Sequence, residues 1–129
     1  MKKTIRSFGY AVKGIIEMVF TQGNARIHLA ALISAIAMGV LFDIHPAEWL
    51  WLCAAGGLVL MAEAFNTSIE YLCDIASPGY SEKAGKVKDL AAGAVLLSAL
   101  TAAAIGAIIF IPKLITIFSA FSYGSDPRY

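Results

Sequence analysis

The sequence predicts an all-α integral membrane protein in which an amphipathic surface helix precedes three transmembrane helices. Of its 129 residues, 59% are hydrophobic and 15% are charged, and the mean hydropathy is +0.74. Soluble domains average about 25% charged and 45–50% apolar residues, so part of this apolar surface must face lipid. Three long apolar runs also recur along the chain. Each approaches the length of about 20 residues that a spanning helix needs.

The segment at about residues 4–21 has the pattern of a surface helix. Apolar residues recur there at three- and four-residue steps, which is typical of one helix face; they are Ile5, Phe8, Val12, Ile15 and Val19. Basic residues occupy other positions, as in helices that lie in the membrane interface with their apolar face toward the lipid. We therefore expect this helix to lie on the membrane surface.

The three spans are expected at about residues 25–42, 48–72 and 88–111. The first reaches a spanning length if its opening residues lie at the interface, and the third reaches it unaided. The second reaches it only if carboxylates are admitted into the membrane. At this length a single domain is expected. It covers residues 1–118, and a polar C-terminal tail follows at residues 119–129.

The distribution of Lys and Arg predicts the orientation of the chain. Eight of these residues lie before the first span or in the second loop, whereas two lie after the third span and none lies in the first loop. Because an excess of basic residues marks short cytoplasmic loops, we expect the N-terminus and the second loop in the cytoplasm. The formal net charge of +1 excludes a polybasic nucleic-acid binder.

The second span carries what we call the acidic stripe, which is Glu63, Asn66, Glu70 and Asp74. At 3.6 residues per turn these four side chains project within about 80° of one another. An ionisable side chain near the bilayer centre costs about 2.5–3.5 kcal/mol. The stripe must therefore face a bundle interior, bind a cation or approach the interface. Alternatively, the span ends near Ala62 and the stripe lies on a solvated cytoplasmic helix.

The acidic stripe approaches the cytoplasmic boundary, where the third span opens with Lys88 and Asp89. These groups suit a magnesium-bound polyphosphate, because Mg²⁺ prefers oxygen ligands and lysine neutralises phosphate as a point charge. A glutamate can also accept a hydroxyl proton. Two other interpretations stay open. The lysines can belong to an ordinary positive-inside loop, or the carboxylates can serve a non-enzymatic membrane module, such as an ion or proton carrier or a helical scaffold.

Other nucleotide and metal motifs do not fit. Residues 79–87 differ from a P-loop in glycine spacing, and Val87 replaces the hydroxyl residue of that motif. His28 and His45 are isolated and make no zinc spacing with the two cysteines. We interpret both histidines as interface residues.

The acidic stripe lies within EAFNTSIEYLCD, which is followed by KVKDLAAGAVLL. Together these segments closely resemble the prokaryotic diacylglycerol kinase family, which includes the undecaprenol kinases. The likeness extends to FGYAVKG and NARIHL and covers roughly residues 5–112. It implies a homotrimeric kinase of the bacterial inner (cytoplasmic) membrane that transfers the γ-phosphate of ATP, with Mg²⁺, to the primary hydroxyl of a lipid alcohol.

The same resemblance implies roles for individual residues. Glu63 would be the general base, Asn66 would help to orient Glu63 and the acceptor, and Glu70 would bind the metal of the nucleotide. Lys88 would hold phosphates. The other residues implied in the nucleotide site are Tyr10, Asp74, Gly79, Tyr80, Ser81 and Asp89.

Two positions depart from the family pattern. Gln22 stands where relatives often carry a second metal-binding glutamate, and Ser81 stands where a histidine is common. An amide oxygen can still ligate Mg²⁺, so Gln22 remains a candidate metal ligand. These departures leave open a homologue that has lost activity. The NARIHL segment resembles the undecaprenol kinases more than the diacylglycerol kinases, and this resemblance favours undecaprenol as the acceptor.

Overall fold

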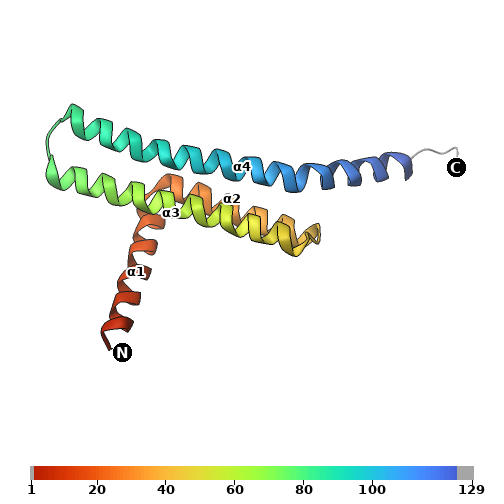
Figure 1. The fold of residues 1–129 in the computed structure, drawn as a ribbon, viewed down its shortest axis with the longest axis horizontal. Helices are drawn as coiled ribbons and strands as arrows, with labels where there is room; N and C mark the ends of the chain where they lie inside the picture. Colours follow the sequence, from red (N-terminus) through yellow and green to blue (C-terminus); the bar gives the residue numbers. More distant parts are fainter. Residues whose placement is uncertain (1, 125–129) are drawn as a thin grey trace.

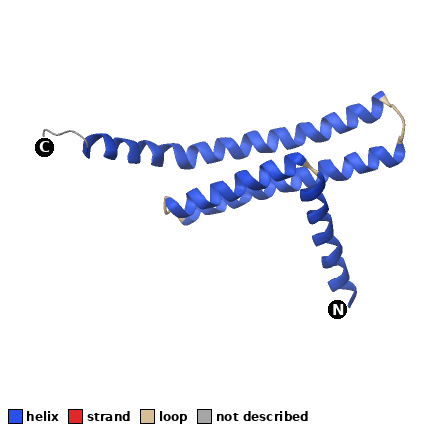
Figure 2. Ribbon diagram, turned by 180° about the vertical axis from the view of Figure 1, so that it is seen from behind, coloured by secondary structure: helices blue, strands red, loops and turns tan. Residues whose placement is uncertain are grey.

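The computed structural model describes residues 2–124 and contains four helices in that range, with no strand. They are α1 (Lys2–Thr21), α2 (Gly23–Leu41), α3 (Pro46–Ala76) and α4 (Glu82–Gly124). Helices α2, α3 and α4 run side by side, whereas α1 leaves the bundle at a steep angle (Figures 1 and 2). Three of the helices are long and apolar enough to cross a membrane. The predicted all-α membrane fold is therefore confirmed.

A single residue, Gln22, separates α1 from α2. Its backbone is extended, with φ −99° and ψ 119°, and its N–H donates to the carbonyl oxygen of Met18 at 2.9 Å. Met18 and Ala25 are buried on either side of this turn. The apolar face of α1 stays exposed, as expected of a helix that covers lipid rather than protein.

The turn between α2 and α3 is fixed by backbone geometry and by a capping box. Asp43 has a φ of 46°, a left-handed conformation that Asp tolerates better than most residues. The imidazole of His45 accepts from the N–H of Ala47, and the carboxylate of Glu48 accepts from the N–H of His45 at 2.7 Å. These bonds satisfy donors that the start of α3 would leave unpaired.

The buried apolar core lies at this turn, where α4 passes by. Ile44 and Leu52 pack with Ile109 and Phe110, and the rings of Phe42 and Phe110 have centroids 6.1 Å apart. The ammonium of Lys113 lies 3.1 Å from the Glu48 carboxylate. Elsewhere most large apolar side chains on the described helices are exposed. Such a surface suits lipid, not water.

Helices α3 and α4 are longer than a bilayer requires. Their 31 and 43 residues span about 46 and 65 Å at 1.5 Å per residue, against a hydrocarbon thickness of about 30 Å. Both helices therefore extend beyond the hydrocarbon region. Helix α4 also enters the stretch predicted as a polar tail, and the remainder of that stretch lies outside the described residues.

Candidate active site

The first half of the acidic stripe is buried between helices. The side chain of Glu63 is 1% exposed and that of Asn66 is 6% exposed. Both line a pocket of about 240 Å³, which is formed by the first turns of α2, the middle of α3 and the facing part of α4. This burial contradicts the alternative in which the whole stripe lies on a solvated helix, because the stripe begins inside the bundle.

Two oxygen atoms in this pocket have no partner. Oε2 of Glu63 and Oδ1 of Asn66 are buried without a hydrogen bond. A buried acceptor without a donor carries a desolvation cost of about 1–3 kcal/mol, and more if it is charged. Since Glu63 and Asn66 line the pocket, a ligand with a hydroxyl group could supply the missing donor there.

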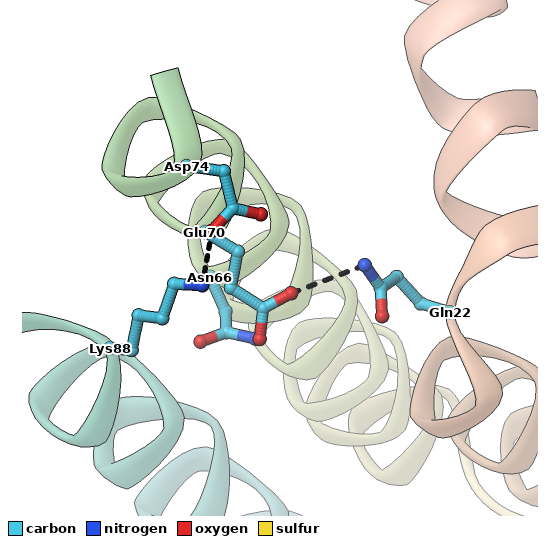
Figure 3. Close-up of polar contacts among 5 residues, drawn as sticks. All are labelled: Gln22, Asn66, Glu70, Asp74 and Lys88. Atoms are coloured by element: carbon cyan, nitrogen blue, oxygen red, sulfur yellow. Dashed lines mark hydrogen bonds and ion pairs between the residues drawn. The ribbon is translucent and has the colours of Figure 1, made fainter. Parts of the chain in front are cut away.

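Further along α3, Glu70 accepts a hydrogen bond at each carboxylate oxygen. Nδ2 of Asn66 lies 3.3 Å from Oε1, and Nε2 of Gln22 lies 3.2 Å from Oε2. Figure 3 shows the Gln22 side chain reaching toward α3 from the turn between α1 and α2. The structure thus brings together Gln22 and Glu70, the two residues that the sequence analysis named as metal ligands. Asn66 donates to Glu70 and also lines the Glu63 pocket.

The last member of the stripe, Asp74, forms an ion pair with Lys88 (Figure 3). This contact joins the end of α3 to the beginning of α4 across the loop at residues 77–81. Both side chains are solvent-accessible, with 65% of the Asp74 side chain and 37% of the Lys88 side chain exposed. Exposed pairs of this kind contribute little to stability, so Lys88 can exchange its partner for another anion at small cost.

The structure does not bring the remaining predicted nucleotide residues into this cluster. Tyr10 is 70% exposed on α1, and Tyr80 is 99% exposed in the loop. Gly79 and Asp89 are also exposed. The hydroxyl of Ser81 instead accepts a hydrogen bond from the backbone N–H of Ala84, at 3.3 Å, in the first turn of α4. Within one chain these residues therefore do not join Glu70 and Lys88 in one cluster.

The sequence analysis missed two side chains that line the Glu63 pocket, Asn24 and His28. It treated His28 as an isolated interface residue. The signal that could have found them is their spacing of four residues on α2, which places both on one helix face. That this face meets Glu63 follows only from the packing of α2 against α3.

The described residues contain no group of three or more His, Cys, Asp or Glu side chains that could hold a metal ion. Glu70 and Gln22 offer one carboxylate and one amide, and Asn66, whose oxygen has no partner, lines the neighbouring pocket. This donor set fits Mg²⁺, which is usually bound by one or two carboxylates together with waters and substrate phosphates rather than by an all-protein cage.

A family comparison decides the assignment. The sequence pattern of the family described as prokaryotic diacylglycerol kinase matches residues 9–110, which is most of the chain. The chain belongs to this family. The matched region begins in α1, contains all of α2 and α3 and ends in α4, so it includes the acidic stripe and the Glu63 pocket.

Individual relatives agree with the family assignment. The chain is 33% identical to an undecaprenol kinase of Bacillus subtilis over 114 residues, which cover 88% of this chain and 93% of that protein. It is 34% identical to a diacylglycerol kinase of Synechocystis over 112 residues, which cover 86% of this chain and 64% of that protein. A diacylglycerol kinase of Escherichia coli is 26% identical over 100 residues, with 78% and 82% covered. The family is thus one of lipid kinases, and the predicted membership is confirmed.

Proposed function

We propose that this protein transfers the γ-phosphate of ATP, in the presence of Mg²⁺, to the primary hydroxyl of a membrane lipid alcohol. One observation carries the proposal. Glu63 is fully buried within a spanning helix, has one oxygen without a partner, and lines a pocket together with Asn66. A carboxylate in such a place is costly unless it has a function. The names of the relatives favour a kinase over the ion or proton carrier that the stripe alone would allow.

In the proposed reaction Glu63 acts on the acceptor. The acceptor hydroxyl donates a hydrogen bond to Oε2 of Glu63, which takes the proton as the oxygen attacks the γ-phosphorus. One O–P bond forms, and the bond from the γ-phosphorus to the bridging oxygen of ATP breaks, with ADP as the leaving group. Asn66 holds its position beside Glu63 through its bond to Glu70. This positions the acceptor, which is the main task of a phosphoryl-transfer enzyme.

Glu70 and Gln22 are the proposed residues that hold the metal at the nucleotide. When bound, Mg²⁺ neutralises charge on the phosphate oxygens. Gln22 would turn its amide so that the oxygen faces the ion, because its nitrogen faces Glu70 in the structure. Lys88 lies at the start of the neighbouring helix α4. Its ammonium can exchange the Asp74 carboxylate for a phosphate. Metal and phosphate would therefore lie between the α1–α2 turn and the start of α4.

The residues of the predicted nucleotide site that lie outside the Glu70 cluster are consistent with a site completed by a second copy of the chain. Tyr10, Gly79, Tyr80, Ser81 and Asp89 remain candidates for nucleotide contacts in a homotrimer. Helix α1 leaves the bundle at a steep angle (Figure 1), so this helix is available to a neighbouring copy. We further propose a location in the bacterial inner membrane with the N-terminus and the α3–α4 loop in the cytoplasm, where ATP is present.

For the acceptor we favour undecaprenol over diacylglycerol. The supporting observation is the NARIHL segment, in which His28 lines the Glu63 pocket. The relatives leave both acceptors open, since enzymes of each name match at similar identity.

The proposal is tested with purified protein in nanodiscs, γ-labelled ATP and a panel of lipid alcohols. We expect label on a lipid alcohol only when Mg²⁺ is present, and a higher kcat/KM for undecaprenol than for diacylglycerol. Nucleotide-independent proton or cation flux in liposomes, without label transfer to any alcohol, would instead support the carrier. Magnesium-dependent ATP binding measured by calorimetry separates a working kinase from a homologue that has lost the site.

A further inference from the structure

The proposed reaction leaves a proton on a side chain that bulk water does not reach. Each time an acceptor is phosphorylated, Glu63 gains the proton of the acceptor hydroxyl, and it must lose this proton before it can act again. The side chain of Glu63 is only 1% exposed. A neighbouring group therefore has to take the proton from Glu63 and pass it to water.

Among the described residues that line the pocket around Glu63, His28 is the one other titratable side chain. The side chains that α4 contributes to this pocket are apolar, and the two that remain are the amides of Asn24 and Asn66. Neither apolar groups nor amides take up a proton near neutral pH. The charge of His28 also acts on the Glu63 carboxylate. An imidazole is a group that takes up and releases protons near neutral pH.

His28 also connects the pocket to the surface of the protein. Its side chain is half-buried, whereas Asn24, about one helical turn nearer the start of α2, is exposed and lines the same pocket. The pocket of about 240 Å³ has room for a water molecule beside an acceptor hydroxyl. In the proposed orientation the start of α2 lies at the cytoplasmic boundary. A proton on His28 is therefore one turn of helix away from a solvent-exposed position.

Glu70 is the other titratable group whose charge acts on Glu63. Its two carboxylate oxygens already accept hydrogen bonds from the amides of Gln22 and Asn66, and in the proposed function they face the metal. Asn66 is the residue that both bonds to Glu70 and lines the Glu63 pocket, and its amide does not titrate near neutral pH. The route through His28 is therefore the better supported of the two.

From this arrangement we infer that His28 accepts the proton from Glu63 after each phosphoryl transfer and releases it to the cytoplasm. The inference rests on the proposed function and adds the route of the proton. First the O–H bond of the acceptor breaks, and its proton passes to Oε2 of Glu63 as the new O–P bond forms. The O–H bond of the neutral Glu63 carboxyl then breaks, and a nitrogen lone pair of His28 takes the proton directly or through one water. Finally the imidazolium loses the proton to water near Asn24, so each phosphorylated lipid is accompanied by one released proton.

The two histidines of the chain provide a matched pair of variants. His28→Asn removes the proton acceptor from the pocket. His45→Asn makes the same change at the α2–α3 turn, where His45 is the N-cap of α3 and asparagine is also a favourable N-cap. Asparagine is smaller than histidine, so both variants should fold, which thermal unfolding in nanodiscs verifies. His28→Gln, with a longer side chain, is a second variant at the same position.

Each variant is mixed with Mg²⁺, γ-labelled ATP and either farnesol or dioctanoylglycerol, after equilibration at mildly alkaline pH, and rapid quenching follows the label. We expect the first turnover of His28→Asn to be as fast as that of the unmodified protein. Its steady-state kcat should be lower by at least about 10²-fold, the lower end of what a positioned proton-transfer group contributes. His45→Asn should match the unmodified protein in both phases.

Rescue by added imidazole is the second readout. The free base should restore the steady-state rate of His28→Asn in proportion to its concentration and should leave His45→Asn unchanged. If the first turnover and the steady-state rate of His28→Asn and His28→Gln fall together, or if imidazole restores neither variant, His28 has a structural role and the inference is overturned. Unchanged rates in both variants would overturn it as well.

A failure of the proposed function has a different signature. In that case the unmodified protein transfers no label to any alcohol, or Glu63→Gln keeps the full rate. If Glu63→Gln is inactive while both His28 variants behave as the unmodified protein, the assignment of the base stands and the proton route through His28 is wrong.

Discussion

Nε2 of Gln22 lies 3.2 Å from Oε2 of Glu70, although 48 residues separate the two positions along the chain. The contact joins the α1–α2 turn to the cytoplasmic half of α3 in the orientation proposed here. A neutral amide that donates to a carboxylate forms a charge-assisted hydrogen bond. This bond is stable without a metal ion between the two groups. A second carboxylate at the Gln22 position would need a cation between the two groups.

The first prediction concerns this pair. Gln22→Glu places two carboxylates beside each other, so Mg²⁺ should bind more tightly and the apparent KM for Mg²⁺ should fall several-fold. Without Mg²⁺ the same variant should have a lower Tm than the unmodified protein, because like charges repel. Gln22→Met serves as the control, since it removes the hydrogen bond without adding charge. An unchanged magnesium dependence in Gln22→Glu would show that the metal lies elsewhere.

Glu63→Gln tests the proposed base. We expect kcat to fall at least about 10²-fold, the typical contribution of a general base, while ATP binding stays intact. The amide is close in size to the carboxylate and removes a buried ionisable group, so Tm should stay the same or rise. Label transfer and thermal unfolding measure the two effects. Retention of the full rate would exclude Glu63 as the base.

The proposed phosphate contact is tested by comparing two lysines of α4. Lys88→Gln should raise KM for ATP about tenfold, since it removes the positive charge that would neutralise the phosphates. Lys86→Gln is the matched control, because Lys86 is paired with Glu82 at 2.7 Å on an exposed helix face. Both pairs are solvent-accessible, so neither change should alter Tm by more than a few degrees. Equal effects of the two changes on KM would indicate a general effect of loop charge.

Alanine substitutions at two adjacent glycines of α3, Gly56 and Gly57, should have opposite effects on stability. At Gly57 an added Cβ meets nothing within 4 Å, whereas at Gly56 it would collide with the side chain of Leu32 on α2. Gly57→Ala should stabilise the protein by about 0.5–1 kcal/mol, because alanine favours a helix over glycine. Gly56→Ala should lose this gain or destabilise the protein, since Leu32 must move. Unfolding in a denaturing detergent compares them, and equal stabilities would contradict the close approach of α2 to α3.

The proposed orientation is tested by single cysteines placed in a variant that lacks both native cysteines. Gly79→Cys lies in the α3–α4 loop and Ala47→Cys lies in the first turn of α3, and both positions are exposed. We expect a membrane-impermeant maleimide to label Gly79→Cys in inside-out vesicles and Ala47→Cys in right-side-out vesicles. The reverse result would place the α3–α4 loop outside the cytoplasm.

The helices themselves could be predicted from the sequence. The apolar runs and the three- and four-residue periodicity predicted the surface helix and the three spans. Helix α4 continues to Gly124, beyond the span predicted at about residues 88–111. Hydropathy reports where a helix leaves the hydrocarbon, and a helix can continue into water when its backbone bonds are kept.

The sequence by itself determined the fold class, the family and the order of groups along the acidic stripe, because helix geometry places residues three, four and seven apart on one face. Only the tertiary structure decided which of these groups is buried. The packing of α2 and α4 on α3 enclosed Glu63 and Asn66, left Asp74 at the surface with Lys88, and brought Gln22 and His28 beside residues far away in the chain. Such contacts depend on how helix faces meet across the bundle. The sequence pattern of one helix does not indicate which face of another helix it packs against.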